Sequence, residues 1–510
     1  MWTKESLKEV IKEKLKDHVF VIVSNREPYS HIYVGQKVKW TGAVSGAVTP
    51  LDFIMQTAKG KWIAAGTGDA DKAVVDKNGE IMVPPDNPRY TLKRLWLSKE
   101  EINGYYNGFS NSTLWPLCHI AHTRPSFHHA EWEIYKKVNE KFANAILEKV
   151  GNSKAFVWIQ DYHLALVPKF LKKKRPDLFV AQFWHIPWPA AETFRICPWR
   201  KDILEGLLAN DLLGFHLNYY CTNFFNTVSR ELEANINYEN SKVSYKDRCT
   251  TIKSFPISVD YEYISNLANH SRKSLKSVTK KYISGDYRYL CLSVERLDYT
   301  KGTLERLEAI DRFLTRYPQY QKKFVYFGIV ALSRMNISAY QNYLKRTEEA
   351  AQRINWKYHT NSWYPITITN DIFGLKELIP LYKNADICMV TSLDDGMNIV
   401  SKEYTSAADP KKGMLILSHF TGTARELTDA IQVNPYNVEQ MTEAIRIALE
   451  MPKKEKMERM KKMKGVIKER NIYRWASKFI LELSNATSSP PPPPPIEPAA
   501  KKEPLKKPKK

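Results

Sequence analysis

The feature that most constrains the fold is the apolar run ADICMVT at residues 385–391, which a turn and a helix-forming segment follow directly. A nearly unbroken apolar run of this length predicts a strand that is buried on both faces of a parallel sheet. The residues LDDG at 393–396 are typical of a turn, and residues 398–408 are good helix formers. A strand–turn–helix unit of this kind predicts an α/β protein.

The same pattern recurs along the chain, where short apolar segments alternate with longer amphipathic ones. Such alternation is typical of α/β proteins with mostly parallel sheets. There are two consecutive series, and each is long enough to form a doubly wound domain with its own core. The predicted strands span residues 18–24, 61–68, 154–159, 178–185, 212–215 and 251–255 in the first series, and 287–294, 323–330, 364–368, 385–391, 414–417 and 431–433 in the second.

We divide the chain at about residue 262, where the first series ends. Residues 1–17 carry apolar side chains at helical spacing, which predicts an amphipathic helix. The first domain then spans residues 18–262 and the second residues 263–466, and we expect a helix at 467–484 to return to the first domain. Residues 485–510 contain six consecutive prolines and several lysines, a composition that predicts a disordered tail.

The net charge of +22 favours anionic partners, although part of it lies in the tail and on one predicted helix. No zinc-finger, helix-turn-helix or RNA-binding signature accompanies the basic residues, so we favour small anionic ligands and expect no nucleic acid. The six cysteines form no CxxC pair, which argues against a zinc site or a disulfide framework. Because neither a signal peptide nor a membrane span is visible, we expect a cytoplasmic protein with no membrane contact.

Charged residues follow two strands of the second series. Arg296 and Lys301 lie five residues apart just after a strand, so both can face one phosphate group. Residues 397–400 begin a predicted helix, and their free N–H groups suit a diphosphate. Glu403 lies further along the same helix, where its carboxylate could bind ribose hydroxyls. We interpret these residues as a nucleotide site; the alternative is a surface loop beside an ordinary strand–turn–helix unit.

Five motifs at predicted strand ends carry a more specific resemblance. They are NREP at 25–28, QDYH at 160–163, WHIP at 184–187, ERLDYTKG at 295–302 and DGMN at 395–398. Over about residues 20–483 the chain resembles the trehalose-6-phosphate synthase family, retaining glucosyltransferases of glycosyltransferase family 20. The resemblance implies the GT-B arrangement, in which two Rossmann-like domains face each other across a cleft. It also implies transfer of glucose from a nucleotide-glucose, usually UDP-glucose, to glucose-6-phosphate, which gives trehalose-6-phosphate.

The resemblance also implies roles for individual residues. The N-terminal domain would bind the acceptor and the C-terminal domain the nucleotide-sugar. The implied catalytic residues are His185, Arg296, Lys301 and Asp161; the implied donor site adds Gly42, Asp395, Gly396, Met397, Asn398, Ile399, Val400 and Glu403; and the implied acceptor site comprises Arg26, Tyr106, Trp115, Asp161 and Arg334. Simpler explanations exist for three of them, because His185 and Trp115 suit a core and Asp161 suits a helix cap.

The resemblance implies no obligatory cofactor, since basic residues and a helix end hold the diphosphate in GT-B enzymes. We therefore expect no metal, although the acidic pairs at 394–395 and at Asp69 and Asp71 could bind one. The implied reaction uses no protein nucleophile. No phosphatase-like module follows residue 483, so a separate trehalose-6-phosphate phosphatase is expected, and the formation of a homo-oligomer is left open.

The chain departs from the family pattern in three places. Asp394 replaces a basic residue and residues 371–375 lack a basic side chain, and both departures leave the donor base open. Thr41 stands where a glycine often precedes Gly42, which stiffens one hinge of the donor loop. A glucosylglycerol-phosphate synthase that uses ADP-glucose, or a pseudo-glycosyltransferase, is therefore an alternative. A non-catalytic sugar-phosphate binder is a further one, but the presence of all the donor residues argues against it.

Overall fold

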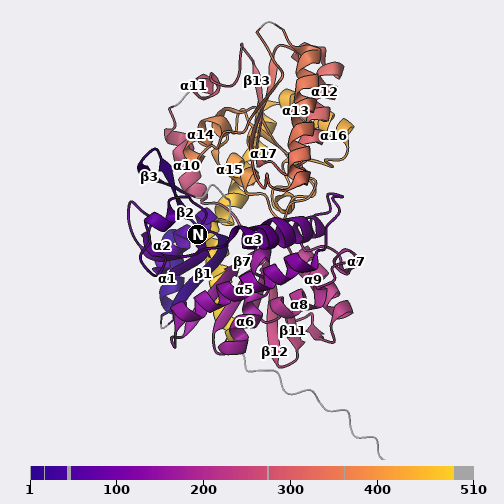
Figure 1. Cartoon of the computed structure of the whole chain (residues 1–510). Helices are drawn as coiled ribbons and strands as arrows, with labels where there is room; N and C mark the ends of the chain where they lie inside the picture. Colours follow the sequence, from indigo (N-terminus) through magenta and orange to yellow (C-terminus); the bar gives the residue numbers. More distant parts are fainter. Residues whose placement is uncertain (1, 17, 43–47, 273–274, 361, 488–510) are drawn as a thin grey trace, which may run out of the picture.

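The computed structural model describes residues 2–16, 18–42, 48–272, 275–360 and 362–487. These residues form two α/β halves, one above the other in Figure 1, each built around one sheet. Within the described ranges no helix is both long and apolar enough to span a membrane. The predicted tail lies almost entirely in residues 488–510, outside the described part of the chain.

The first half is built on a ten-stranded sheet with the order β10-β11-β12-β9-β8-β7-β1-β4-β6-β5. Its seven central strands, from β12 to β6, run parallel, whereas β5, β10 and β11 pair antiparallel at the edges. The strands are β1 (Val19–Arg26), β4 (Lys61–Ala65), β5 (Glu80–Val83), β6 (Tyr90–Leu95), β7 (Ala155–Gln160), β8 (Phe179–Phe183), β9 (Leu212–Phe215), β10 (Asn235–Asn237), β11 (Lys242–Tyr245) and β12 (Arg248–Ser254).

The second half has a fully parallel six-stranded sheet with the order β15-β14-β13-β16-β17-β18. This is the strand order of a dinucleotide-binding doubly wound fold. The strands are β13 (Tyr289–Arg296), β14 (Phe324–Ala331), β15 (Ile366–Thr369), β16 (Ile387–Val390), β17 (Met414–Ser418) and β18 (Ile431–Val433). All residues of β16 and β17 are buried, as their apolar sequences predict.

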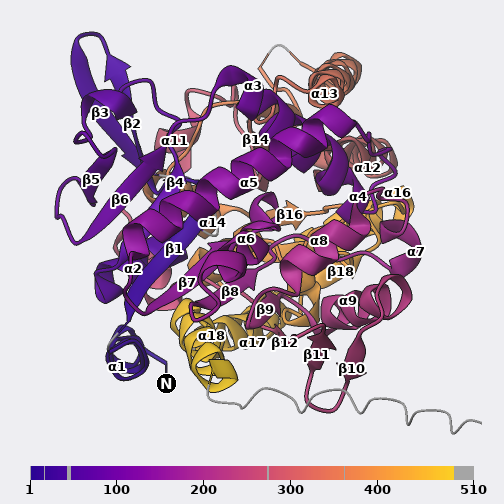
Figure 2. The ribbon, with the colours of Figure 1, turned by 60° about the horizontal axis from the view of Figure 1, so that its bottom comes forward.

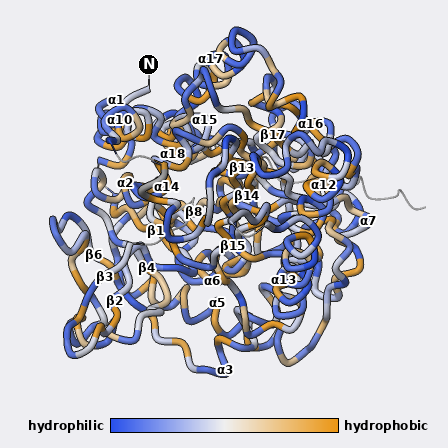
Figure 3. The backbone as a smooth tube through the Cα atoms, turned by 90° about the horizontal axis from the view of Figure 1, so that it is seen from above, coloured by the Kyte–Doolittle hydropathy of each residue, from blue (hydrophilic) through white to orange (hydrophobic). Residues whose placement is uncertain are grey.

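Helices cover both sheets. Those of the first half are α1 (Lys4–Lys14), α2 (Val48–Ala58), α3 (Lys99–Glu101), the π-helix η2 (Ile102–Leu114), α4 (Trp115–Cys118), α5 (His129–Val150), α6 (Val167–Lys174), α7 (Ala191–Phe194), α8 (Arg200–Leu207) and α9 (Asn218–Glu231). Those that follow are α10 (Tyr261–His270), α11 (Leu275–Thr279), α12 (Thr303–Arg316), α13 (Ser338–Tyr358), α14 (Leu375–Asn384), α15 (Ile399–Ala407), α16 (Val438–Glu450), α17 (Lys453–Glu469) and α18 (Ile472–Thr487). In Figure 3 apolar residues gather on central strands such as β13 and β14, and polar ones follow the outer helices.

The last helix, α18, packs on the sheet of the first half. Its Phe479 ring stacks on Trp158 of β7 with ring centroids 4.3 Å apart, and it also packs along α1. Figure 2 shows α18 in yellow beside the strands β8 and β9. The chain therefore crosses between the halves twice, after β12 and after α17. The domain boundaries that we assigned from the sequence remain predictions.

The sequence interpretation missed six strands, all in the first half. The hairpin of β2 (Tyr29–Val34) and β3 (Lys37–Gly42) lies in a segment where the sequence interpretation placed no strand. Every residue of β3 is exposed, including the alternating Val38 and Trp40, so this strand lacks the unbroken apolar run that identifies the central strands. The other four, β5, β6, β10 and β11, lie at or beside the edges of the ten-stranded sheet. Most residues of β5, β10 and β11 are not buried, and β6 is buried at alternate positions and carries charged residues, so none of the four has a continuous apolar run.

Candidate active site

Both sheets place their predicted site residues where the strand order changes direction. In the second sheet this point lies between β13 and β16, and in the first sheet between β1 and β7. Ligands of doubly wound proteins bind outside the carboxyl ends of the strands at such points. Arg296 ends β13 and Arg26 ends β1, while Asp395 and Asp161 follow β16 and β7. These four predicted residues thus come from four different strand ends.

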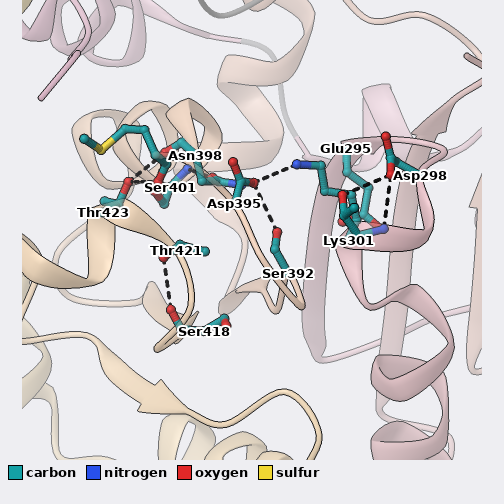
Figure 4. Close-up of polar contacts among 12 residues, drawn as sticks. Glu295, Asp298, Lys301, Ser392, Asp395, Asn398, Ser401, Ser418, Thr421 and Thr423 are labelled. Carbon is teal, nitrogen blue, oxygen red and sulfur yellow. Dashed lines mark hydrogen bonds and ion pairs between the residues drawn. The ribbon is translucent and has the colours of Figure 1, made fainter. Parts of the chain in front are cut away.

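On the second half, Asp395 is the centre of a polar cluster (Figure 4). Its Oδ2 atom lies 2.7 Å from the Nζ atom of Lys301 and accepts hydrogen bonds from Ser392 at 3.3 Å and Asn398 at 3.1 Å. Burial alone would raise the pKa of Asp395, but the Lys301 ammonium and the Asn398 amide hold this pKa at about 2. Asp395 is therefore a fixed carboxylate, suited to accept hydrogen bonds from sugar hydroxyls.

The loop after Asp395 delivers the chain into helix α15. Asn398 has the unusual backbone angles φ 77° and ψ 96°, and its side chain caps the helix by accepting a hydrogen bond from the N–H of Ser401 at 3.0 Å. The N–H of Thr423 donates to the carbonyl of Met397 at 2.9 Å, which ties the loop to the segment after β17. Ile399 and Val400 supply the N–H groups of the first helical turn, which have no intrahelical acceptor and suit an anion.

Glu403 lies one turn further along α15. Its Oε2 atom accepts a hydrogen bond from the hydroxyl of Tyr382 at 3.2 Å. Burial raises the pKa of Glu403 to about 7. A carboxyl group that is this poorly solvated gains from partners that donate hydrogen bonds, such as vicinal hydroxyls.

Between the halves, three cationic side chains surround the aromatic residues of the predicted acceptor site. The guanidinium of Arg334 lies 3.9 Å from the ring centroid of Trp115, and that of Arg296 lies 5.6 Å from it. The Nη2 atom of Arg26 donates to the hydroxyl of Tyr106 at 3.3 Å. Burial alone would raise the pKa of Tyr106, but Arg334 and Arg26 lower this pKa to about 8. Such a concentration of positive charge suits a phosphate group.

The two cations that we predicted on one phosphate occupy neighbouring positions around Asp298. The Nη1 atom of Arg334 lies 3.3 Å from Asp298, and the indole N–H of Trp115 donates to it at 3.4 Å. Burial alone would raise the pKa of Asp298, but Arg334, Arg296 and Lys301 lower it. Arg296 thus lies near the predicted acceptor residues, and Lys301 lies near Asp395. Both cationic side chains are close enough to Asp298 to lower the pKa of its carboxyl group.

Asp161 and His185 form the floor of the site on the first half. The Oδ1 atom of Asp161 accepts hydrogen bonds from the N–H groups of Tyr162 at 3.0 Å and His185 at 3.1 Å. Burial raises the pKa of Asp161 to about 6 and lowers the pKa of His185 to about 3. The His185 carbonyl faces Gly396 of the second half, where an added Cβ atom would lie 2.4 Å from its oxygen.

Asp394 points away from the cluster around Asp395. Its Oδ2 atom accepts a hydrogen bond from the N–H of Ile120, on the first half, at 2.9 Å. Burial raises the pKa of Asp394 to about 7. The carboxyl group that replaces the family's basic residue is therefore directed at a backbone donor of the first half.

Two buried arginines support the site and were missed in the sequence. Arg306 of α12 makes two 2.9 Å contacts with Glu295 and donates to the Lys301 carbonyl at 3.0 Å. The Nε atom of Arg94, on β6, lies 2.6 Å from the carboxylate of Glu27, which is the residue that follows Arg26 in the chain. A charged residue within an apolar helical stripe, as at Arg306, Ile310 and Phe313, was an available signal for the first.

The remaining sequence alternatives can be placed. Asp161 caps the short helix η3 (Tyr162–Leu164), and Trp115 is only 5% exposed, so the simpler roles coexist with site positions. Asp71 lies 2.9 Å from Arg94, and Asp69 accepts from the N–H of Tyr33. No cluster of three His, Cys, Asp or Glu side chains suited to a metal occurs in the part of the chain that is described. Gly42 ends β3, and residues 43–47 after it lie outside that part.

Comparison with known proteins gives a consistent result. The profile of glycosyltransferase family 20 matches residues 18–485. The α,α-trehalose-phosphate synthase (UDP-forming) 56 kDa subunit of Saccharomyces cerevisiae is 34% identical over 477 residues, which are 92% of this chain and 94% of the yeast protein. A trehalose-6-phosphate synthase of Mycobacterium avium is 33% identical over 92% of this chain and 95% of its own.

Solved structures agree with this result. An Escherichia coli trehalose-6-phosphate protein with bound UDP-2-fluoro glucose superposes with a TM-score of 0.80 at 30% identity, over 93% of this chain and 100% of that one. A Burkholderia xenovorans synthase in complex with glucose-6-phosphate has a TM-score of 0.80 at 29% identity, over 91% and 99% of the two chains. The predicted GT-B fold and family are confirmed: the chain belongs to glycosyltransferase family 20.

Proposed function

We propose that this protein is an α,α-trehalose-phosphate synthase, which transfers glucose from a nucleotide-glucose to glucose-6-phosphate with retention and yields trehalose-6-phosphate. One observation carries the proposal. Lys301 pairs with Asp395 beside the first turn of α15, and it acts on the carboxylate of Asp298 together with Arg296 and Arg334, which form a cationic cluster with Arg26. A donor diphosphate and an acceptor phosphate thus each have positive charge to meet them. The related yeast protein is named as UDP-forming, and on that basis we propose UDP-glucose as the donor.

In this proposal the second half binds the donor. Lys301 and Arg296 contact the diphosphate, which also receives hydrogen bonds from the backbone around Asn398, Ile399 and Val400. Glu403 accepts hydrogen bonds from the ribose hydroxyls. Asp395 accepts hydrogen bonds from hydroxyl groups of the glucose, because its low pKa keeps the carboxylate ionised. Gly396 and Met397 shape the loop beneath the sugar, and Gly42 approaches from the first half.

The acceptor lies between the halves. Arg26, Tyr106 and Arg334 hold the phosphate of glucose-6-phosphate. Trp115 covers the sugar ring of this acceptor, and Asp161 accepts hydrogen bonds from the sugar hydroxyls. Because Arg334 belongs to the second half and the others to the first, the acceptor pocket is complete only when the halves are together.

Retention follows if the acceptor attacks on the face from which the diphosphate leaves. The anomeric oxygen of glucose-6-phosphate bonds to C1 of the donor glucose as the bond from C1 to the β-phosphate oxygen breaks, and a phosphate oxygen takes the hydroxyl proton. Arg296 and Lys301 stabilise the negative charge that grows on the leaving phosphate. The carbonyl of His185 faces the positively charged sugar, and the neutral imidazole that its low pKa predicts adds no opposing charge. Positioning supplies much of the remaining rate enhancement.

The test is to incubate the full-length protein with UDP-, GDP- or ADP-glucose and with glucose-6-phosphate or glycerol-3-phosphate, and to measure the released nucleoside diphosphate and the product. We expect trehalose-6-phosphate from UDP-glucose, and Arg296→Ala should lower kcat/KM on the order of 100-fold. Arg353→Ala, an exposed arginine of the same half, is the matched control and should leave the rate unchanged. Product from glycerol-3-phosphate alone would favour the glucosylglycerol-phosphate alternative, and an unaffected Arg296→Ala would refute the assignment.

We further propose that the enzyme works in the cytoplasm without an obligatory metal, nucleic acid or membrane. Full activity after dialysis against a chelator would support metal independence. The product is a phosphate ester, so a phosphatase reaction must follow to release the free sugar. A separate phosphatase and a homo-oligomeric state remain predictions; one relative, from Thermoproteus tenax, is named as a bifunctional synthase/phosphatase.

A further inference from the structure

Two side chains of the second half contact the backbone of one residue of the first half. The N–H of Ile120 donates to the Oδ2 atom of Asp394 at 2.9 Å, and the Ile120 carbonyl accepts from the hydroxyl of Tyr436 at 3.4 Å. Both polar groups of a single peptide segment are thus bound from across the interface. The ring of Tyr436 also lies 6.2 Å from that of His122, so the contact extends along the segment.

The segment around Ile120 leads directly into the acceptor site. It follows helix α4, whose first residue is Trp115. The His119 ring lies 4.0 Å from that of Trp115 and its Nδ1 atom is 2.9 Å from the Trp115 carbonyl, which ties the two ends of this short helix together. The Ile120 segment is therefore joined through His119 to Trp115, the residue over which Arg334 packs.

On the other side, Asp394 leads directly into the donor site. It precedes Asp395, whose carboxylate binds Lys301 and whose N–H donates to the Phe420 carbonyl at 3.1 Å. The backbone at residue 395 is thus held from two directions, and Asp394 has little freedom to follow a separate motion. A donor that orders this loop would fix Asp394 as well.

We infer that Asp394 and Tyr436 form a clasp on the backbone of Ile120 that couples the donor loop to the acceptor site. Asp394 is a positioning residue in this scheme, because its carboxylate accepts from the Ile120 N–H and we assign it no contact with the sugar or the phosphate. The inference deepens the proposed function, because it names the element that completes the acceptor pocket once the donor loop is ordered. Asparagine at position 394 retains an oxygen acceptor for the Ile120 N–H, whereas alanine removes it.

Hydrogen exchange at the Ile120 amide tests the clasp without reference to catalysis. In Asp394→Ala the amide should exchange at least about tenfold faster than in the wild type, and Asp394→Asn should restore protection. Asp409→Ala is the matched control, because Asp409 binds backbone of its own half only, and it should leave Ile120 unchanged. Equal exchange in the wild type and Asp394→Ala, or equal loss in the Asn and Ala variants, would overturn the clasp.

Steady-state kinetics test the coupling. Asp394→Ala should raise KM for glucose-6-phosphate about tenfold while the Kd for UDP-glucose alone changes less than about twofold, and the Asn variant should return KM toward the wild-type value. Tyr436→Phe should raise the same KM by a smaller factor. If the wild-type protein has no transferase activity but the Ile120 amide exchanges in the wild type and the variants as predicted, the proposed function is refuted and the clasp stands. If Asp394→Ala changes kcat but not KM for glucose-6-phosphate, the coupling is overturned.

Discussion

Three proposed or neighbouring site residues adopt backbone conformations that are rare outside glycine. Asp161 has a φ of 71°, Arg334 a φ of 56° and Asn398 a φ of 77°. Such conformations cost on the order of 1–3 kcal/mol each and persist where the surroundings impose them. Here the surroundings are hydrogen bonds: Asp161 accepts two N–H groups and Asn398 caps α15. Of the three, Arg334 reaches the other half, where its Nη2 atom donates to the Tyr162 hydroxyl at 3.2 Å, which agrees with its proposed role.

Glu403 gives the site a pH dependence at the residue scale. Burial raises its pKa to about 7 in the free protein, so below that pH it is mainly protonated and must lose a proton before it can accept two ribose hydroxyls. Donor affinity should therefore fall by up to about tenfold per pH unit below pH 7 and level off above it. Calorimetric Kd values for UDP-glucose at pH 6 and pH 8 measure this effect. The same slope in Glu403→Gln would show that another group is responsible.

At the scale of elements, the loop between β16 and α15 determines how closely the halves approach. Its backbone is held by the segment after β17, because the N–H of Gly422 donates to the Asp395 carbonyl at 3.0 Å and that of Thr423 to Met397 at 2.9 Å. These two hydrogen bonds position the loop against the first half. Gly396 comes so close to the His185 carbonyl that the contact leaves no room for a side chain.

A methyl group at this contact should separate the two half-sites. In Gly396→Ala the new Cβ atom would lie 2.4 Å from the His185 oxygen, so we expect kcat/KM to fall at least about tenfold while the fold is retained. Gly465→Ala is the control: no atom lies within 4 Å of its Cβ position on α17, and it should raise stability by about 0.5–1 kcal/mol. Thermal unfolding and kinetics measure both variants. Wild-type kinetics in Gly396→Ala would show that this contact is not needed for turnover.

At the scale of the whole molecule, the two crossings between the halves are tied to each other and to α15. The N–H of Ile472 donates to the Val259 carbonyl at 3.1 Å, which joins the crossings. The buried Nζ atom of Lys402, next to Glu403, donates to the Ile257 carbonyl at 2.6 Å and lies 2.5 Å from Glu426. The two crossings between the halves are therefore anchored on α15, the helix that we propose to bind the nucleotide.

The Lys402–Glu426 pair should respond to mutation as a unit. Both side chains are buried, so Lys402→Met removes the buried cationic partner of Glu426 and should destabilise the protein by at most about 3–5 kcal/mol. Lys402→Met combined with Glu426→Gln removes both charges and should recover most of that loss. Arg470, 3.4 Å from Glu426, softens the single-variant effect. Denaturant unfolding of the two single variants and the double variant measures the coupling, and additive losses would contradict it.

The sequence by itself determined the strand–helix alternation, most of the central strands and the unit from β16 to α15. These features depend on burial along a short segment, and a strand buried on both faces leaves an apolar run that is visible locally. The exposed hairpin β2–β3 and the edge strands left no such run. The family resemblance then supplied a set of site residues, but it could not say where their side chains lie.

Only the tertiary structure decided those positions. It places Arg296 beside Trp115 and Lys301 on Asp395, turns Asp394 toward Ile120, and supports the loops with Arg306 and Arg94. Asp394 and Ile120 are 274 residues apart, and no local pattern encodes a hydrogen bond over that distance. Contacts of this kind depend on how two complete sheets meet, because each partner is positioned by its own half of the molecule.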